Sequence, residues 1–182
     1  FSVQKLLNEN NETCQISKKN KGLKHNYLCL LRRGVENNEK QSFICCLADA
    51  YSRLIKKEKI NTKRVFSIKR MKDIIIDKCT LDIFITLQNG TLVETFYNKD
   101  EDLEIDDYMD SEIYKKLTKR NFNNNKQKYF EKICNAYLNF IDYLRNDKVE
   151  INYEYLWDFV SLHLFEEKIN LLILNIPDDD IT

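Results

Sequence analysis

Turn-forming residues are the scarcest part of this sequence, because its 182 residues include three glycines and one proline. Collagen-like chains, flexible linkers and turn-rich β-sandwiches all depend on these two residues to bend or interrupt the backbone. The composition therefore argues against those classes. A hydrophobic content of 43% is also too high for a disordered chain. We expect a folded, mainly helical protein.

The length suits one domain of ordinary size. We predict a single domain over 1–182 that includes a polar N-terminal segment, 1–24, and that is excised from a longer chain. Six cysteines occur without a C-x-x-C pair, and the first twelve residues are polar, unlike a secretory signal. We therefore expect reduced thiols, an intracellular location and no disulfide framework.

Apolar residues recur at three- to four-residue spacing in six stretches, which predicts six helices. These are 41–57, 68–78, 81–88, 111–117, 126–145 and 153–164. Ser42, Ser67 and Thr80 stand where an N-cap would accept bonds from the first turn. Asn89-Gly90 would end the third helix, although the same pair suits a hairpin between strands. Thr91–Tyr97 is ambiguous.

One segment favours a sheet. Ile169–Ile176 is an almost unbroken apolar run of strand length before Pro177, which is typical of a central strand buried on both faces. Tyr27–Leu31 would be a strand or a buried extended segment. We therefore predict the α+β class: a mainly helical domain with a small sheet.

The charges balance, with 29 Lys and Arg against 29 Asp and Glu. Zero net charge argues against a nucleic-acid partner and against a polybasic membrane domain. No apolar run approaches the roughly 20 residues that span a bilayer, so no membrane partner is expected. The basic residues of 18–33 and the acidic run 100–107 are expected to be solvated loops. No cofactor and no metal site is predicted.

The helical patterns also predict which side chains are buried. Cys45, Cys79 and Cys134 lie inside apolar patterns, where cysteine acts as a small hydrophobe. Cys46 is expected on the buried side of its helix, next to Leu47. On the 126–145 helix we expect Tyr129 and Tyr143 to be half exposed.

The segment from Glu39 to Tyr51 is the best candidate for chemistry. It places a small nucleophilic residue, Ser42, at the start of a long helix. A helix N-terminus lowers the pKa of a thiol and offers backbone N–H groups to an oxyanion. The segment resembles the signature of the ovarian tumour (OTU) family of deubiquitinating cysteine proteases, Asp-Gly-(Asn/Asp)-Cys followed by an apolar helix. Trp157 and Ile169–Ile176 are similar in spacing to a later Trp and strand of that family.

The resemblance implies an OTU-like, papain-related architecture. Its site would comprise Ser42 at the nucleophile position, Gln41 at the oxyanion position and Glu39 at the acidic position. Serine replaces the family's cysteine and Lys40 replaces its glycine, and an alcohol needs a strong base to react. We therefore expect a pseudoenzyme: a protein-binding or scaffolding domain that takes ubiquitin or a ubiquitin-like protein near Ser42. The alternative is an active isopeptidase completed by residues outside this chain.

A second resemblance covers both ends of the chain. Residues 31–36, 41–44 and 175–182 are similar to a protein of nucleocytoplasmic large DNA viruses, and the abundance of Asn, Lys and Ile fits an AT-rich genome. This likeness implies a viral protein of the host cytoplasm, viral factory or virion, with other viral proteins as partners. It also implies a further alternative, a viral structural or transcription-associated domain with nucleic-acid contacts.

Overall fold

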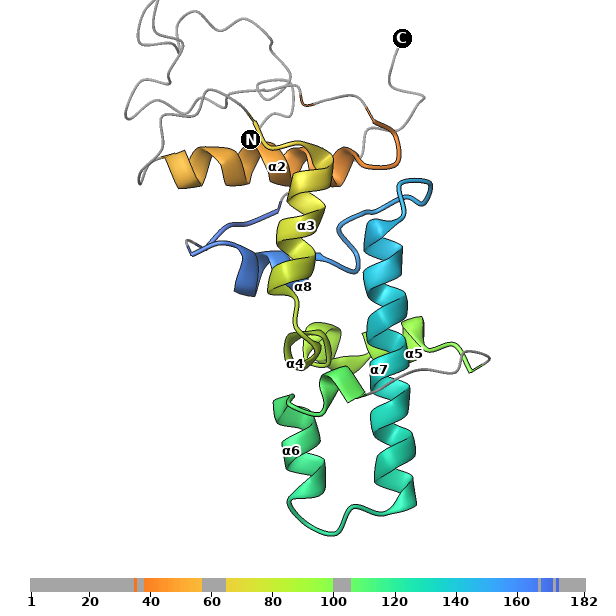
Figure 1. The fold of residues 1–182 in the computed structure, drawn as a ribbon. Coiled ribbons are helices and arrows are strands. Elements are labelled where there is room, and N and C mark those ends of the chain that lie inside the picture. Colours follow the sequence, from red (N-terminus) through yellow and green to blue (C-terminus); the bar gives the residue numbers. More distant parts are fainter. Residues whose placement is uncertain are drawn as a thin grey trace, which may run out of the picture. The chain divides into compact units, whose positions relative to one another are not determined.

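The computed structural model describes residues 35, 38–56, 65–99, 106–166, 168–171 and 173, without the side chains of residues 55 and 56. The chain divides into two compact units, Phe1–Glu36 and Asn37–Thr182. Residue 35 alone is described in the first unit, and all the described helices belong to the second (Figure 1).

The helices of the second unit vary in length from 22 residues to single turns. In chain order they are α2 (Ser42–Lys56), α3 (Ile68–Lys78), α4 (Leu81–Phe84), η2 (Leu87–Gly90), α5 (Leu92–Phe96), η3 (Asp106–Tyr108), α6 (Glu112–Thr118), α7 (Asn124–Arg145), α8 (Trp157–Phe159) and η4 (Val160–Leu164).

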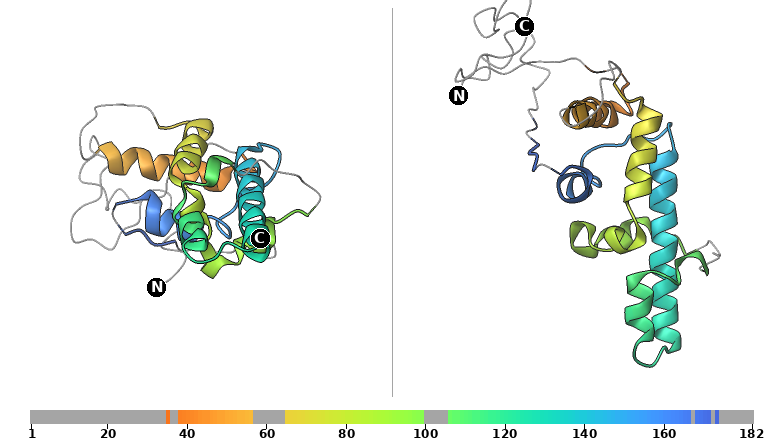
Figure 2. Two further views of the ribbon diagram at one scale, coloured as in Figure 1. Left: turned by 60° about the horizontal axis from the view of Figure 1, so that its bottom comes forward. Right: turned by 60° about the vertical axis from the view of Figure 1, so that its left-hand side comes forward.

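Helix α7 is the central element. Its 3–4 spacing of apolar residues buries nine side chains, and it contacts α3, α4 and α5 (Figure 2). The Asn123 side chain accepts the Lys126 N–H at 3.1 Å and so begins the helix. In the core, the rings of Phe84 and Phe140 lie 5.1 Å apart, and the Tyr137 hydroxyl donates to the Cys79 carbonyl at 2.7 Å. The predicted 126–145 helix is thus confirmed.

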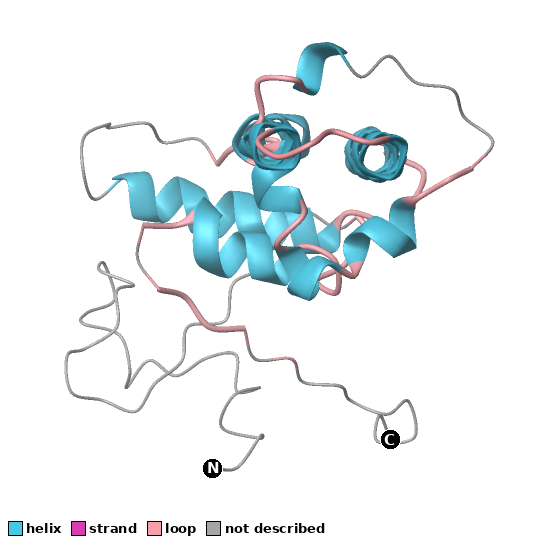
Figure 3. Cartoon of the chain, turned by 90° about the horizontal axis from the view of Figure 1, so that it is seen from below, coloured by secondary structure: helices cyan, strands magenta, loops and turns pink. Residues whose placement is uncertain are grey.

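The described residues contain no strand, so the predicted α+β class is wrong, and with it the OTU-like architecture that needs a sheet (Figure 3). The apolar side of α2, which includes Ile44 and Leu47, is buried and faces helix α3 where a sheet was expected. Residues 169–171 and 173 of the predicted strand have no regular structure. Its other residues, and Tyr27–Leu31, lie outside the described part. Leu171 and Ile173 are 38% and 43% exposed, so the prediction of a strand buried on both faces is wrong for these described residues. An apolar run of this length does not by itself establish a buried strand.

The predicted 81–88 helix is shorter than expected, because α4 ends at Phe84. Gln88 and Asn89 adopt left-handed backbone, with φ of +47° and +55°. Two tertiary contacts hold this turn: the Gln88 N–H donates to Asp158 Oδ2 at 2.8 Å, and the Gln88 side chain donates to the Glu154 carbonyl. These contacts stabilise a conformation that costs a non-glycine residue about 1 kcal/mol or more.

Two predicted caps are confirmed and one is displaced. The Ser67 hydroxyl accepts the N–H of Arg70, and the Thr80 hydroxyl accepts that of Ile83. Ser42 instead is the first helical residue of α2, because Asn38 Oδ1 accepts the N–H groups just before it.

Three further helices match in part. The ambiguous Thr91–Tyr97 segment contains α5, so the hairpin alternative does not occur. The predicted 111–117 helix corresponds to α6. The predicted 153–164 helix begins only at Trp157 and continues as a π-helical turn, η4.

Burial follows the helical pattern with one exception. Cys45, Cys79 and Cys134 are buried as predicted, whereas Cys46 is exposed. It is two residues from Ile44, which rotates it by about 200° to the opposite side of α2. Tyr129 is exposed and Tyr143 is half-buried, close to the prediction.

Candidate functional site

The three predicted site residues adjoin one another at the start of α2, but their side chains have different surroundings. Glu39 and Ser42 are exposed, whereas Gln41 is 1% exposed. Gln41 Nε2 donates to the Val149 carbonyl at 2.8 Å, and the Ile151 N–H donates to the Lys40 carbonyl at 2.9 Å. The side-chain amide at the predicted oxyanion position therefore ties the start of α2 to the loop after α7.

No described base acts on Ser42. His163 is exposed and its ring stacks on Phe159 at 6.1 Å, and no hydrogen bond within the described residues joins it to Ser42. His25 lies outside the described part. The site residues Glu39, Gln41 and Ser42 stay predictions, without a catalytic arrangement around them.

The four described thiols do not supply a nucleophile in place of Ser42. Burial, and secondarily the charge of Asp49, raises the pKa of the Cys46 thiol. Burial raises the pKa of both Cys79 and Cys134 to about 12. A reactive cysteine needs the opposite shift, because the thiolate is the nucleophile.

A cluster of positive charge lies elsewhere, on the hairpin formed by α6, the connection 119–123 and the first turns of α7 (Figure 1). No carboxylate occurs between Glu112 and Glu131. The same stretch contains six cations: Lys115, Lys116, Lys119, Arg120, Lys126 and Lys128. A chain of zero net charge thus concentrates six positive charges in 18 consecutive residues, 113–130.

Two of these cations are used within the fold. Lys115 Nζ pairs with Glu112 Oε1 at 3.0 Å. Lys126 Nζ donates to the Leu117 carbonyl at 3.0 Å and to the Arg120 carbonyl, so it closes the C-terminal end of α6.

The other four cations are exposed, and no ion pair in the described part of the chain engages them. We call Lys116, Lys119, Arg120 and Lys128 the basic tip. Three lie at the end of α6 or just after it, and the fourth on the second turn of α7.

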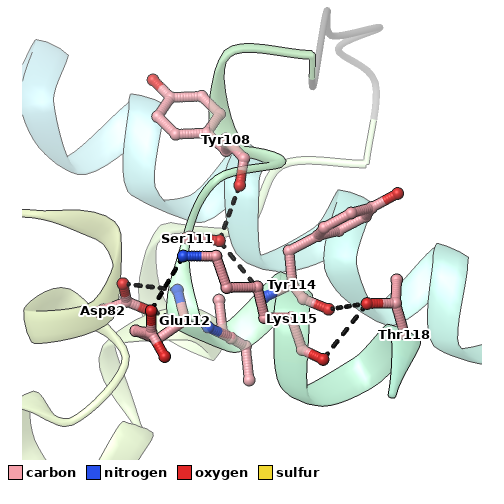
Figure 4. A network of polar contacts seen from close by, with 8 residues as sticks. Asp82, Tyr108, Ser111, Glu112, Tyr114, Lys115 and Thr118 are labelled. Carbon is pink, nitrogen blue, oxygen red and sulfur yellow. Dashed lines mark hydrogen bonds and ion pairs between the residues drawn. The ribbon is translucent and has the colours of Figure 1, made fainter. Parts of the chain in front are cut away.

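The opposite end of α6 is fixed by acidic and hydroxyl groups (Figure 4). The carboxylate of Asp82, on α4, accepts the N–H groups of Glu112 and Ile113 at 2.9 and 2.8 Å. The Ser111 hydroxyl accepts the Tyr114 N–H at 3.3 Å. These bonds set the direction of α6 and therefore the position of the basic tip.

Rings join α6 to α7 beneath the tip. The centre of the Tyr114 ring lies 4.9 Å from that of Phe130 and 5.6 Å from that of Phe122. Phe130 is fully buried. The cations are therefore presented by a hairpin whose two arms are packed together, which lowers the entropy lost on binding.

The basic tip was not predicted from the sequence, because the zero net charge argued against nucleic acid and the two local charge runs considered, 18–33 and 100–107, do not include it. Counting the charges in a sliding window along the sequence would have found it, since segment 113–130 contains no acidic residue. Within the described part, no group of three or more His, Cys, Asp and Glu side chains could hold a metal ion. None of the described helices has the length and apolar content to cross a membrane.

Comparison with known proteins identifies no relative: no family model, no curated protein and no solved structure matches the chain. The two resemblances noted in the sequence therefore stay predictions, and the OTU-like fold is the part of them that the helical structure contradicts.

Proposed function

We propose that this protein is a helical binding module whose basic tip contacts the phosphate backbone of a nucleic acid. The observation that carries the proposal is the acid-free stretch 113–130, whose four exposed cations have no ion pair among the described residues. Clustered cations without carboxylates attract polyanions even when the whole protein is neutral. This corresponds to the alternative of a domain with nucleic-acid contacts.

The number of cations limits the strength of this interaction. Each phosphate that a cation neutralises releases bound counterions, with a slope of log K against log salt of about −0.9 per contact on duplex and −0.7 on single strands. Four contacts at the basic tip would give a slope of about −3 to −4. Binding should therefore be clear at 50 mM salt and much weaker at 200 mM.

A protein partner stays the second candidate. An acidic protein surface would meet the same cations, and ubiquitin or a ubiquitin-like protein belongs to the earlier prediction around Ser42. The surroundings of Ser42 give no specific support to that prediction, because Gln41 is buried and bonded to Val149. The basic tip is therefore the better-supported surface.

Fluorescence anisotropy with labelled 20-nucleotide single strands and 20-base-pair duplexes tests the proposal. The variant carries Lys116→Glu, Lys119→Glu and Arg120→Glu. A matched control carries Lys69→Glu, Arg70→Glu and Lys99→Glu, which replaces three exposed cations elsewhere and gives the same net charge.

We expect the tip variant to lose binding and to flatten the salt dependence, because it removes three of the four proposed phosphate contacts. The control should bind within about threefold of the original chain. Equal losses in the two variants would mean that total charge, and not the basic tip, is responsible. Binding of ubiquitin or of an acidic protein, without binding of either nucleic acid, would replace this proposal by the second candidate.

A further inference from the structure

One side of α7 carries polar and aromatic residues next to the basic tip. Asn125, Lys128, Tyr129 and Lys132 follow one another at spacings that place them on one stripe of the helix. Tyr129 is 51% exposed, whereas its neighbour Phe130 is fully buried. The stripe therefore offers a large ring to solvent beside Lys128, which also belongs to the basic tip.

A second ring lies at the far end of the stripe. Lys132 Nζ is 5.1 Å from the centre of the Tyr97 ring, and Tyr97 is 38% exposed. The same ammonium pairs with both oxygens of Glu94, at 2.6 and 2.7 Å. Its charge is therefore already balanced, so this end of the stripe attracts phosphate less than the basic tip does.

The backbone around Tyr97 is firmly held against α7. The Asn98 N–H donates to Asn135 Oδ1 at 2.8 Å, and Asn139 Nδ2 donates to the Phe96 carbonyl at 3.0 Å. Tyr129 sits on a helix that nine buried residues anchor. Both rings are thus presented by fixed backbone, and a stacked base would order little additional chain.

We infer that the nucleic acid bound is single-stranded, with its backbone at the basic tip and an unpaired base stacked on Tyr129; this rests on the proposed function. Bases inside a duplex are already stacked on one another and cannot use a protein ring. Exposed aromatic rings beside a cationic track are how single strands are bound without strong sequence preference. The charge pattern gives the order along the nucleic-acid strand: the basic tip, whose cations have no ion pair within the described part of the chain, then the Tyr129 ring, and then Lys132, which Glu94 neutralises.

Tyr129→Leu tests this inference, with Tyr129→Phe as the conservative variant and Tyr153→Leu as the matched control. Tyr153 is another exposed tyrosine, outside the hairpin. Anisotropy is measured with fluorescein-labelled dT20 and with a 20-base-pair duplex, at 50 and 150 mM NaCl. Circular dichroism and thermal unfolding verify that each variant is folded.

We expect Tyr129→Leu to weaken dT20 binding by about 5- to 100-fold and duplex binding by less than twofold. Tyr129→Phe should keep dT20 binding, and the salt slope of Tyr129→Leu should match the original, because no charge has changed. An unchanged affinity of Tyr129→Leu for dT20, or an equal loss on dT20 and duplex, overturns the inference.

The two proposals fail in different ways. If the triple charge reversal at the basic tip leaves binding unchanged, the proposed function is wrong. If that reversal abolishes binding but Tyr129→Leu does not weaken dT20, only the single-strand inference is wrong. Vesicles with 30% phosphatidylserine give a further arm, and Tyr129-dependent vesicle binding without dT20 binding would replace the nucleic acid by an anionic lipid surface.

Discussion

Asp82→Ala should release helix α6 while leaving α7 folded. The Asp82 carboxylate accepts two N–H groups at the start of α6, from Glu112 and Ile113, at 2.9 and 2.8 Å. No residue of α6 is fully buried. Its apolar contacts, such as that of Tyr114 with Phe130, are only partly buried, so the helix depends strongly on the groups at its ends.

The magnitude follows from the two effects that the substitution removes. Loss of an N-terminal cap costs about 0.5–2 kcal/mol, and loss of a negative charge near a helix N-terminus costs a further 0.3–1 kcal/mol or so. The Ser111 hydroxyl still accepts the Tyr114 N–H. We expect a total of about 1–3 kcal/mol for local opening, which corresponds to roughly 5- to 150-fold faster amide exchange in α6.

Native-state hydrogen exchange with mass spectrometry measures this opening, and amides of residues 133–144 in α7 serve as the internal reference. Asp77→Ala is the matched control, because Asp77 is an exposed acid in the last turn of α3. A change of less than twofold in α6, or the same acceleration in Asp77→Ala, would refute the argument that Asp82 holds this helix.

Two further predictions concern the core. Asp147→Asn should lower the free energy of urea unfolding by about 1–3 kcal/mol, because it leaves the buried Lys72 ammonium, 2.7 Å away, without its carboxylate. Lys72→Met, which removes the buried charge itself, should lower it by less. Burial raises the pKa of Cys79, Cys134 and Tyr137 to about 12, so the folded chain keeps protons that the unfolded chain releases. Stability should be full below about pH 9 and fall toward pH 12, and Cys79→Val should flatten that fall; a pH-independent urea midpoint would contradict it.

Helix starts were predictable where the signal is local. The hydroxyls of Ser67 and Thr80 each accept a hydrogen bond from the backbone N–H three residues later. The capping signal is therefore contained in four consecutive residues of the sequence. Helix α7 was equally predictable, because its apolar periodicity is long and each buried residue lies within one helical turn of the previous one.

The features of the fold that were not predicted depend on contacts between residues far apart in the sequence. The left-handed turn at Gln88 is held by Asp158, 70 residues away, and Gln41 is bonded to Val149, 108 residues away. Neither partner is implied by the local sequence. The predicted strand at Ile169–Ile176 was an inference from length and apolarity alone; of its described residues, Ile169 packs against the core without regular structure, and Leu171 and Ile173 are exposed.

The candidate site was missed for a different reason. The sequence does contain its signal, but the predicted site followed a short motif at Glu39–Ser42. The nucleic-acid argument used the total charge, and the local runs considered, 18–33 and 100–107, lie outside 113–130. A sum of zero conceals six cations in 113–130, because it averages this stretch with acid-rich segments such as 100–112. Charge arguments of this kind need the distribution along the chain as well as the total.

The fold itself does not account for the basic tip. A helix gains from cations near its C-terminal end, and Lys126 supplies that stabilisation to α6 by direct bonds to its carbonyls. Lys116, in the last turn of α6, and Lys119, its C-cap, gain a few tenths of a kcal/mol from the same helix end, and their like charges at i,i+3 cost a similar amount. Replacing both by glutamine should therefore change the free energy of unfolding by less than about 0.5 kcal/mol, while nucleic-acid binding falls. Weaker binding at nearly unchanged stability is expected of residues kept for a partner, whereas a loss of stability of about 1 kcal/mol or more would assign these lysines to the fold.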